Sequence, residues 1–151
     1  MALTCHCESL YKPVADFVSR SNASAGPDPR ARLSAYLTAS FRPPVTDPAL
    51  LGSWTGFWAL ARTNSRAAQI HRTGYAAYRA RLAALLVDCG LTGELAARQA
   101  IALTALVDGL WLELVLDPAT FGRDGAIAII EENLWRPAPD KRDEYESPFL
   151  L

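Results

Sequence analysis

Hydrophobic residues recur every three or four positions along most of the chain, and no segment alternates steadily between hydrophobic and polar residues. The first pattern places side chains on one face of an α-helix, whereas steady alternation is typical of a half-buried β-strand. Short breaks rich in proline, glycine and aspartate separate the periodic segments. The pattern therefore predicts an all-α fold of six helices without a β-sheet. The predicted helices span 8–21, 29–41, 48–62, 66–89, 94–117 and 123–134.

Several helix ends carry recognisable capping residues. Asp28-Pro29 and Asp47-Pro48 each combine a carboxylate suited to an N-cap with a proline suited to the first helical position. Gly90 is predicted to end the fourth helix, because glycine readily adopts the left-handed conformation that follows a helix. Thr92 is the predicted N-cap of the fifth helix.

A chain of 151 residues is long enough for one domain with a hydrophobic core. We assign that domain to residues 8–136. Residues 1–7 carry no hydrophobic pattern and are predicted to be a short disordered start. Residues 137–151 are rich in prolines and charges and are predicted to be a flexible tail.

The fifth predicted helix is hydrophobic on nearly every face. In a soluble protein such a helix must be covered all round. The other helices of a small domain can cover one side, and we expect a second copy of the chain to cover the other. Asp108, Trp111 and Glu113 lie in the middle of this helix, which predicts polar groups held in apolar surroundings.

Residues 100–116 form the one candidate for a membrane span. An acidic residue near the centre of a spanning helix costs about 2.5–3.5 kcal/mol. This segment contains Asp108 and Glu113 and has no flanking basic cluster. We therefore predict no membrane partner.

Composition narrows the class of protein further. The 15 basic and 16 acidic residues nearly balance, which argues against a large nucleic-acid-binding surface. Three cysteines are too few for a disulfide scaffold, and residues 1–7 lack the features of a signal peptide. The expected location is the reducing cytoplasm. The predominance of arginine over lysine is typical of a GC-rich bacterial genome.

Aromatic side chains and one acidic residue form the main candidate site. Trp54 and Trp58 lie four residues apart and share one helix face, and Tyr75 and Tyr78 share another. Aromatic faces attract organic cations, and a nearby carboxylate adds to that attraction. The candidate ligand-binding residues are Trp54, Phe57, Trp58, His71, Tyr75, Tyr78, Asp108 and Trp111.

Ordinary core packing is the alternative for this set, and periodicity alone favours it because aromatic side chains bury large areas. Asp108 fits that alternative less well, since a buried carboxylate needs an arginine, a helix end or a ligand as its partner. His71 either hydrogen-bonds a ligand or is an ordinary, partly exposed helix residue, and its position alone favours the second interpretation.

The sequence carries no signature of catalysis or metal binding. Cys5-His6-Cys7 contains metal-ligand residue types, but adjacent residues do not readily close a tetrahedral zinc site. No nucleophile elbow, phosphate-binding glycine loop or dinucleotide fingerprint occurs. We therefore predict a protein that is not an enzyme and has no cofactor or metal. A small enzyme with Asp108 or His71 as its base is the disfavoured alternative.

Three segments match a known family in order along the chain. They are Trp54-Thr-Gly-Phe-Trp58, the stretch from His71 through Tyr75 and Tyr78 to Leu82, and Leu106-Val-Asp-Gly-Leu-Trp111. Together they resemble the C-terminal regulatory domain of TetR-family repressors, and most closely that of the BetI-type, choline-responsive repressors. The most specific part is the Asp-Gly-Leu-Trp tetrad within a long apolar helix.

The resemblance implies an all-α, six-helix domain for ligand binding and dimerisation. Its last two helices, 94–117 and 123–134 here, would pair with those of a second copy in a four-helix bundle. A small effector would bind among the inner helices and release an operator. The effector of the type member is choline, a quaternary ammonium ion.

One feature departs from the family. TetR-family repressors begin with a helix-turn-helix head that reads DNA, whereas only residues 1–7 precede the first predicted helix here. We therefore expect this chain not to bind nucleic acid directly. Two alternatives to an effector-binding domain are a pure helical dimerisation module and a truncated partner that pairs with a full-length relative.

Overall fold

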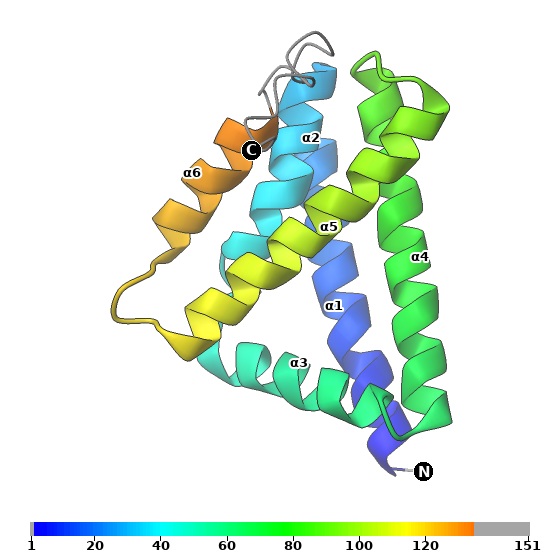
Figure 1. The fold of residues 1–151 in the computed structure, drawn as a ribbon, viewed down its shortest axis with the longest axis vertical. Helices are drawn as coiled ribbons and strands as arrows, with labels where there is room; N and C mark the ends of the chain where they lie inside the picture. Colours follow the sequence, from blue (N-terminus) through cyan, green and yellow to red (C-terminus); the bar gives the residue numbers. More distant parts are fainter. Residues whose placement is uncertain (1, 135–151) are drawn as a thin grey trace, which may run out of the picture.

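A computed structural model of the chain describes residues 2–134, with side chains from residue 12 onward, and all regular structure in that range is helical. The all-α, six-helix prediction is confirmed (Figure 1). The elements are α1 (Ala2–Ser24), α2 (Pro29–Thr38), the 3₁₀ turn η1 (Ala39–Phe41), α3 (Pro48–Ala61), α4 (Ser65–Asp88), α5 (Gly93–Leu116) and α6 (Arg123–Leu134). The predicted tail at 137–151 lies outside the described residues.

The predicted capping residues occupy the expected helix ends. The Asp28 carboxylate accepts hydrogen bonds from the backbone N–H groups of Arg30 and Ala31, at 3.3 and 3.1 Å. Asp47 caps α3 in the same way. Gly90 follows α4 with φ 99°, a left-handed conformation that favours glycine.

The first helix begins earlier than predicted. Because α1 starts at Ala2, the expected disordered start at 1–7 is wrong for residues 2–7. Leu3 and Cys7 continue the three- and four-residue spacing of Leu10 and the apolar residues that follow it. That extension is too short to be recognised as a pattern by itself.

The second helix ends differently from its prediction. Its last residues tighten into η1, because Arg42 precedes Pro43 and therefore adopts an extended backbone, with φ −116° and ψ 151°. Thr92 occupies the N-cap of α5, but its side chain makes no capping hydrogen bond.

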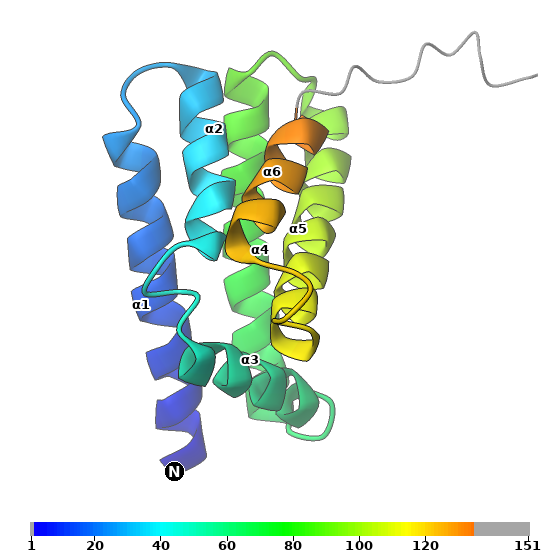
Figure 2. The ribbon, with the colours of Figure 1, turned by 90° about the vertical axis from the view of Figure 1, so that its left-hand side faces the viewer.

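The helices α1, α2 and α4 stand roughly upright in Figures 1 and 2, and α3 crosses their lower end. The α5 helix runs obliquely across them in Figure 1, with α6 beside α2 and α5. Fully buried side chains close the core between them. The largest are Phe41, Leu33, Leu37, Leu82, Leu85 and Ile130. The lower end, where α3 meets α1, α4 and α5, is where the candidate site lies.

The α5 helix is covered on one side only. Val107 and Leu114 are buried, whereas Ile101 and Leu116 are 54% and 70% exposed. The large hydrophobic residues on its exposed side are Leu95, Ile101, Leu112 and Leu116. The expectation that the chain covers only part of this helix is confirmed, and its coverage by a second copy stays a prediction.

Glu113 does not lie in apolar surroundings, so that prediction is wrong for this residue. It is exposed, whereas Asp108 is partly buried on the neighbouring side of α5. Among the described helices, α5 alone is long and apolar enough to cross a bilayer. The core helix of a soluble protein meets the same criterion, and α5 packs against α3, α4 and α6. We therefore interpret it as a core helix.

Candidate ligand-binding site

A cavity of about 620 Å³ lies between α1, α3, α4 and α5, and η1 closes part of it. Helical spacing directs two predicted residues from each of three helices, α3, α4 and α5, into this space. The six predicted residues that line it are Trp54, Trp58, Tyr75, Tyr78, Asp108 and Trp111. The structure therefore brings most of the candidate set together, although their binding of a ligand stays a prediction.

Three tryptophans meet on one side of the cavity. The ring of Trp54 lies 5.8 Å from that of Trp111, in an edge-on contact at 73°, and 6.4 Å from that of Trp58. Edge-to-face contacts of this kind stabilise aromatic pairs beyond their buried area. The cavity thus has a well-packed aromatic side.

Asp108 is the one acidic residue that lines the cavity, and the basic residues Lys12, Arg66 and Arg81 also line it. The Asp108 Oδ1 accepts a hydrogen bond of 2.8 Å from the Tyr75 hydroxyl. Burial raises the pKa of Asp108 to about 6, although the Tyr75 hydrogen bond and the charge of Arg79 both act to lower it. A tyrosine is therefore the partner that this carboxylate needed, and at neutral pH the group carries a negative charge in a largely apolar space.

Trp111 also fixes the shape of the cavity. Its indole Nε1–H donates a hydrogen bond of 2.8 Å to the backbone carbonyl oxygen of Ser40 in η1. Because both groups are buried, this bond joins α5 to the turn after α2 at a point without competing water. Trp111 is therefore a structural residue as well as a lining residue.

Two predicted residues do not line the main cavity. Phe57 is buried behind Trp54, with ring centroids 5.8 Å apart, and belongs to the core. The His71 ring lies 4.1 Å from the Tyr75 ring, tilted by 43°, and His71 lines a second hollow instead. Its pKa is lowered by burial and by the charge of Arg79, so the imidazole is neutral at pH 7.

Several residues that line the cavity were not among the predicted site residues. The Tyr36 ring stacks on Tyr78 at 5.0 Å, and the Tyr36 hydroxyl donates to the Tyr78 carbonyl oxygen. Burial raises the pKa of both tyrosines, so both stay neutral. Arg81 lines the cavity and donates to Asn22 Oδ1 at 3.0 Å. No local pattern in α2 or α4 distinguishes Tyr36 and Arg81 from ordinary core and surface positions.

The raised pKa of Asp108 predicts a pH-dependent stability. The folded protein binds the proton of the Asp108 carboxyl more tightly than the unfolded chain does. Proton binding therefore stabilises the folded state below the unfolded pKa of 3.8, and this stabilisation is lost as pH rises to about 6. Asp108→Asn, which cannot ionise, should raise the free energy of unfolding by about 1–3 kcal/mol more at pH 7.5 than at pH 4. Urea unfolding at both pH values measures the difference.

Asp16→Asn is the matched control, because Asp16 is an exposed acid that pairs only with Lys12 one turn away. Exposed pairs of this kind contribute little, so its effect should be small at both pH values. Equal effects of Asp108→Asn at pH 4 and pH 7.5 would show that the folded protein does not raise the pKa of Asp108.

Solved structures of transcriptional regulators share this fold. A protein from Pseudomonas aeruginosa PAO1, described as a transcriptional regulator, matches with a TM-score of 0.76 and 34% identity, over 83% of this chain and 62% of that one. A transcriptional regulator from Rhodococcus sp. Rha1 matches with the same TM-score at 22% identity, over 87% of this chain and 68% of that one. The fold of this chain is thus one that solved structures of transcriptional regulators share.

Sequence comparison identifies the family of this chain. Residues 29–136 match the model of the C-terminal domain of BetI-type transcriptional repressors, and the chain belongs to that family. It is 31% identical over 103 residues to the HTH-type transcriptional regulator BetI of Yersinia pestis (strain Pestoides F), covering 68% of this chain and 52% of the relative. The BetI of Pectobacterium carotovorum (strain PC1) is 32% identical over 114 residues, covering 72% and 57%. The chain spans about half the length of these relatives.

Proposed function

We propose that this chain is the effector-binding and dimerisation region of a TetR/BetI-type transcriptional repressor, and that its effector is a small organic cation of the choline class. The observation that carries the proposal is the Asp108 carboxylate facing a cavity walled by tryptophan and tyrosine rings. A pure dimerisation module with a filled core is less well supported, because the cavity lies beside Asp108.

The chemistry of the cavity suits a cation with a hydrocarbon surface. Aromatic faces attract such a cation by about 0.5–2 kcal/mol each, depending on how far it is desolvated. The carboxylate adds a Coulombic attraction that the partly buried site strengthens. A methylated ammonium group carries its charge beneath apolar methyl groups and can therefore contact the rings and the carboxylate together.

The exposed side of α5 supports self-association. Small residues, Ala102, Ala105 and Gly109, lie on the same exposed side as Ile101 and Leu112. Small residues allow two helices to approach closely, and the larger ones supply apolar area for burial. The proposed homodimer forms through α5 and α6, and the proposed location is the cytoplasm, where repressors act.

A ligand in this cavity would touch helices that are far apart in the sequence. Val14 and Val18 of α1 line it opposite residues of α3, α4 and α5. Occupancy would therefore alter how α1 lies against α4. TetR-family regulators typically dimerise and respond to small-molecule effectors, and a shift of α1 is the proposed first step of such a response.

Fluorescence and calorimetric titrations test the proposal. Choline, betaine aldehyde and larger quaternary ammonium compounds should change tryptophan emission saturably, because Trp54, Trp58 and Trp111 line the cavity. A compound that binds should also release or absorb measurable heat. Unchanged emission and heat for every compound would contradict the proposal.

A further inference from the structure

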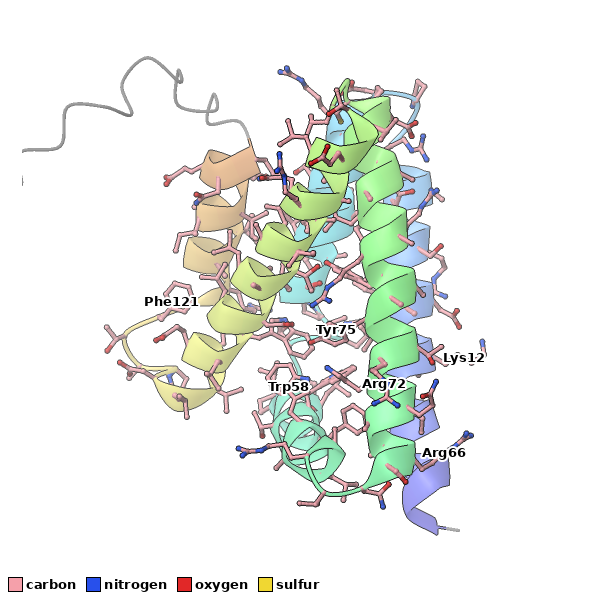
Figure 3. The ribbon with its side chains drawn as sticks, turned by 45° about the vertical axis from the view of Figure 1, so that its right-hand side comes forward. Lys12, Trp58, Arg66, Arg72, Tyr75 and Phe121 are labelled. Atoms are coloured by element: carbon pink, nitrogen blue, oxygen red, sulfur yellow. The ribbon has the colours of Figure 1, made fainter. Side chains whose placement is uncertain are left out.

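A second hollow of about 450 Å³ adjoins the proposed effector cavity. It lies between the end of α3, the first half of α4 and the middle of α5. Trp58, Tyr75 and Asp108 line both spaces, so they form a shared wall. Figure 3 shows Trp58 and Tyr75 near each other where α3, α4 and α5 meet. Arg62 and Arg79 line the second hollow and not the first.

Two residues that line this hollow each have a buried donor without a hydrogen-bond partner among the described residues. The donors are the indole Nε1–H of Trp58 and the Nε–H of Arg79. The Arg79 guanidinium lies over the Tyr75 ring, with Cζ 5.4 Å from its centroid, which holds the group at the hollow. A buried donor without an acceptor is costly, and such groups commonly have a water or ligand as their partner.

The charges of the hollow favour an anion. Within the part of the chain that the structure describes, neither Arg62 nor Arg79 forms an ion pair with a carboxylate. His71 adds a neutral imidazole at one edge. Asp108 is the one acidic residue that lines the hollow, and its Oδ1 already accepts the Tyr75 hydroxyl. The hollow is thus lined by two arginines and by a single carboxylate that already accepts a hydrogen bond.

We propose that this hollow is a second binding site, for a carboxylate or a similar planar oxyanion held by Arg62 and Arg79, with the Trp58 indole N–H as a further donor. The planar guanidinium fork matches the two oxygens of a carboxylate. The anion is either a separate small carboxylate or the anionic end of a molecule whose cationic part lies in the neighbouring cavity. The site itself does not depend on the proposed effector.

Nitrogen–proton NMR of the tryptophan indoles reports on the site directly, and Trp58→Phe assigns the Trp58 signal. Sodium acetate should shift that signal saturably when sodium chloride at equal ionic strength does not. Trimethylammonium carboxylates of increasing spacer length test whether the anion is the end of a ligand whose cation lies in the neighbouring cavity. Choline is the comparison compound, because it carries the same cation without a carboxylate. Saturable binding of acetate supports a separate carboxylate, and binding only of the zwitterions supports a shared ligand.

Arg62→Gln is the deciding variant, because Arg62 is exposed at the end of α3 and its loss should not unfold the protein. It should weaken carboxylate binding about five- to tenfold and leave choline binding unchanged. Arg72→Gln is the matched control on α4, since Arg72 is exposed and its Nη2 donates to Gln69 at 2.7 Å outside the hollow.

The proposal is overturned if no carboxylate shifts the Trp58 signal, or if Arg62→Gln and Arg72→Gln weaken binding equally. Choline binding that persists in either case leaves the effector proposal standing, so the two proposals fail separately. Arg79→Gln gives a second test. Urea unfolding first shows that the variant is folded, and its carboxylate affinity is then compared with that of the unaltered protein.

Discussion

Leu112→Arg should convert the proposed dimer into monomers, with a dimer dissociation constant raised by roughly 100-fold or more. Leu112 lies on the exposed side of α5, where the chain leaves large hydrophobic residues uncovered. In a two-fold symmetric dimer each substitution occurs twice in the interface. Two unpaired guanidinium groups would then be buried in place of two leucines, and each burial costs several kcal/mol.

Val87→Arg is the control for this prediction. Val87 is also an exposed hydrophobic residue, 47% exposed, but it belongs to α4, which is not one of the two helices of the proposed interface. Light scattering after size-exclusion chromatography should show a dimer for the unaltered chain and for Val87→Arg, and a monomer for Leu112→Arg. A Leu112→Arg variant that stays dimeric would place the interface elsewhere.

Trp111→Ala should lower the free energy of unfolding by about 3–5 kcal/mol, the usual cost of removing a large buried aromatic side chain. The Trp111 ring is buried against Trp54, and its indole is the donor to the Ser40 carbonyl oxygen. The substitution therefore removes packing and leaves a buried carbonyl without its partner. Urea unfolding followed by circular dichroism measures the loss.

Trp111→Phe separates the two contributions, because it keeps an aromatic ring and removes the N–H. It should cost about 1–2 kcal/mol, the loss expected from an unpaired buried acceptor with partly retained packing. If Trp111→Ala lowered the free energy of unfolding by less than Trp111→Phe does, the contacts of Trp111 with α3 and η1 would not stabilise the fold as described.

The sequence predicted the helices well because their signals are local. Asp28 and Asp47 cap helices through bonds within three residues of themselves, and the periodic spacing of apolar residues survives any arrangement of the helices. Trp54, Trp58, Tyr75, Tyr78, Asp108 and Trp111 line one cavity because each predicted pair shares a helix face. Helical spacing therefore accounts for the residues of one helix lying together, whereas the meeting of the three helices depends on how α3, α4 and α5 pack.

The remaining features depend on how helices cross, which periodicity does not specify. Tyr36 stacks on Tyr78 across 42 positions of sequence, and Arg62 approaches Arg79 only because α3 crosses the end of the bundle. Phe57 lies one residue from Trp58 yet points into the core. The second hollow could not be predicted from the sequence pattern, because its lining residues come from three different helices.

Calorimetry with a matched pair of ligands at pH 7.5 tests the central claim, that the cavity recognises a small organic cation. The pair is choline and its uncharged carbon analogue, 3,3-dimethyl-1-butanol, which has nearly the same shape. Choline should bind about tenfold more tightly or better, because only it is attracted by the Asp108 carboxylate and the aromatic faces. Asp108→Asn should remove most of that preference. Equal affinity for the two compounds in the unaltered chain, or binding of neither, would contradict the account.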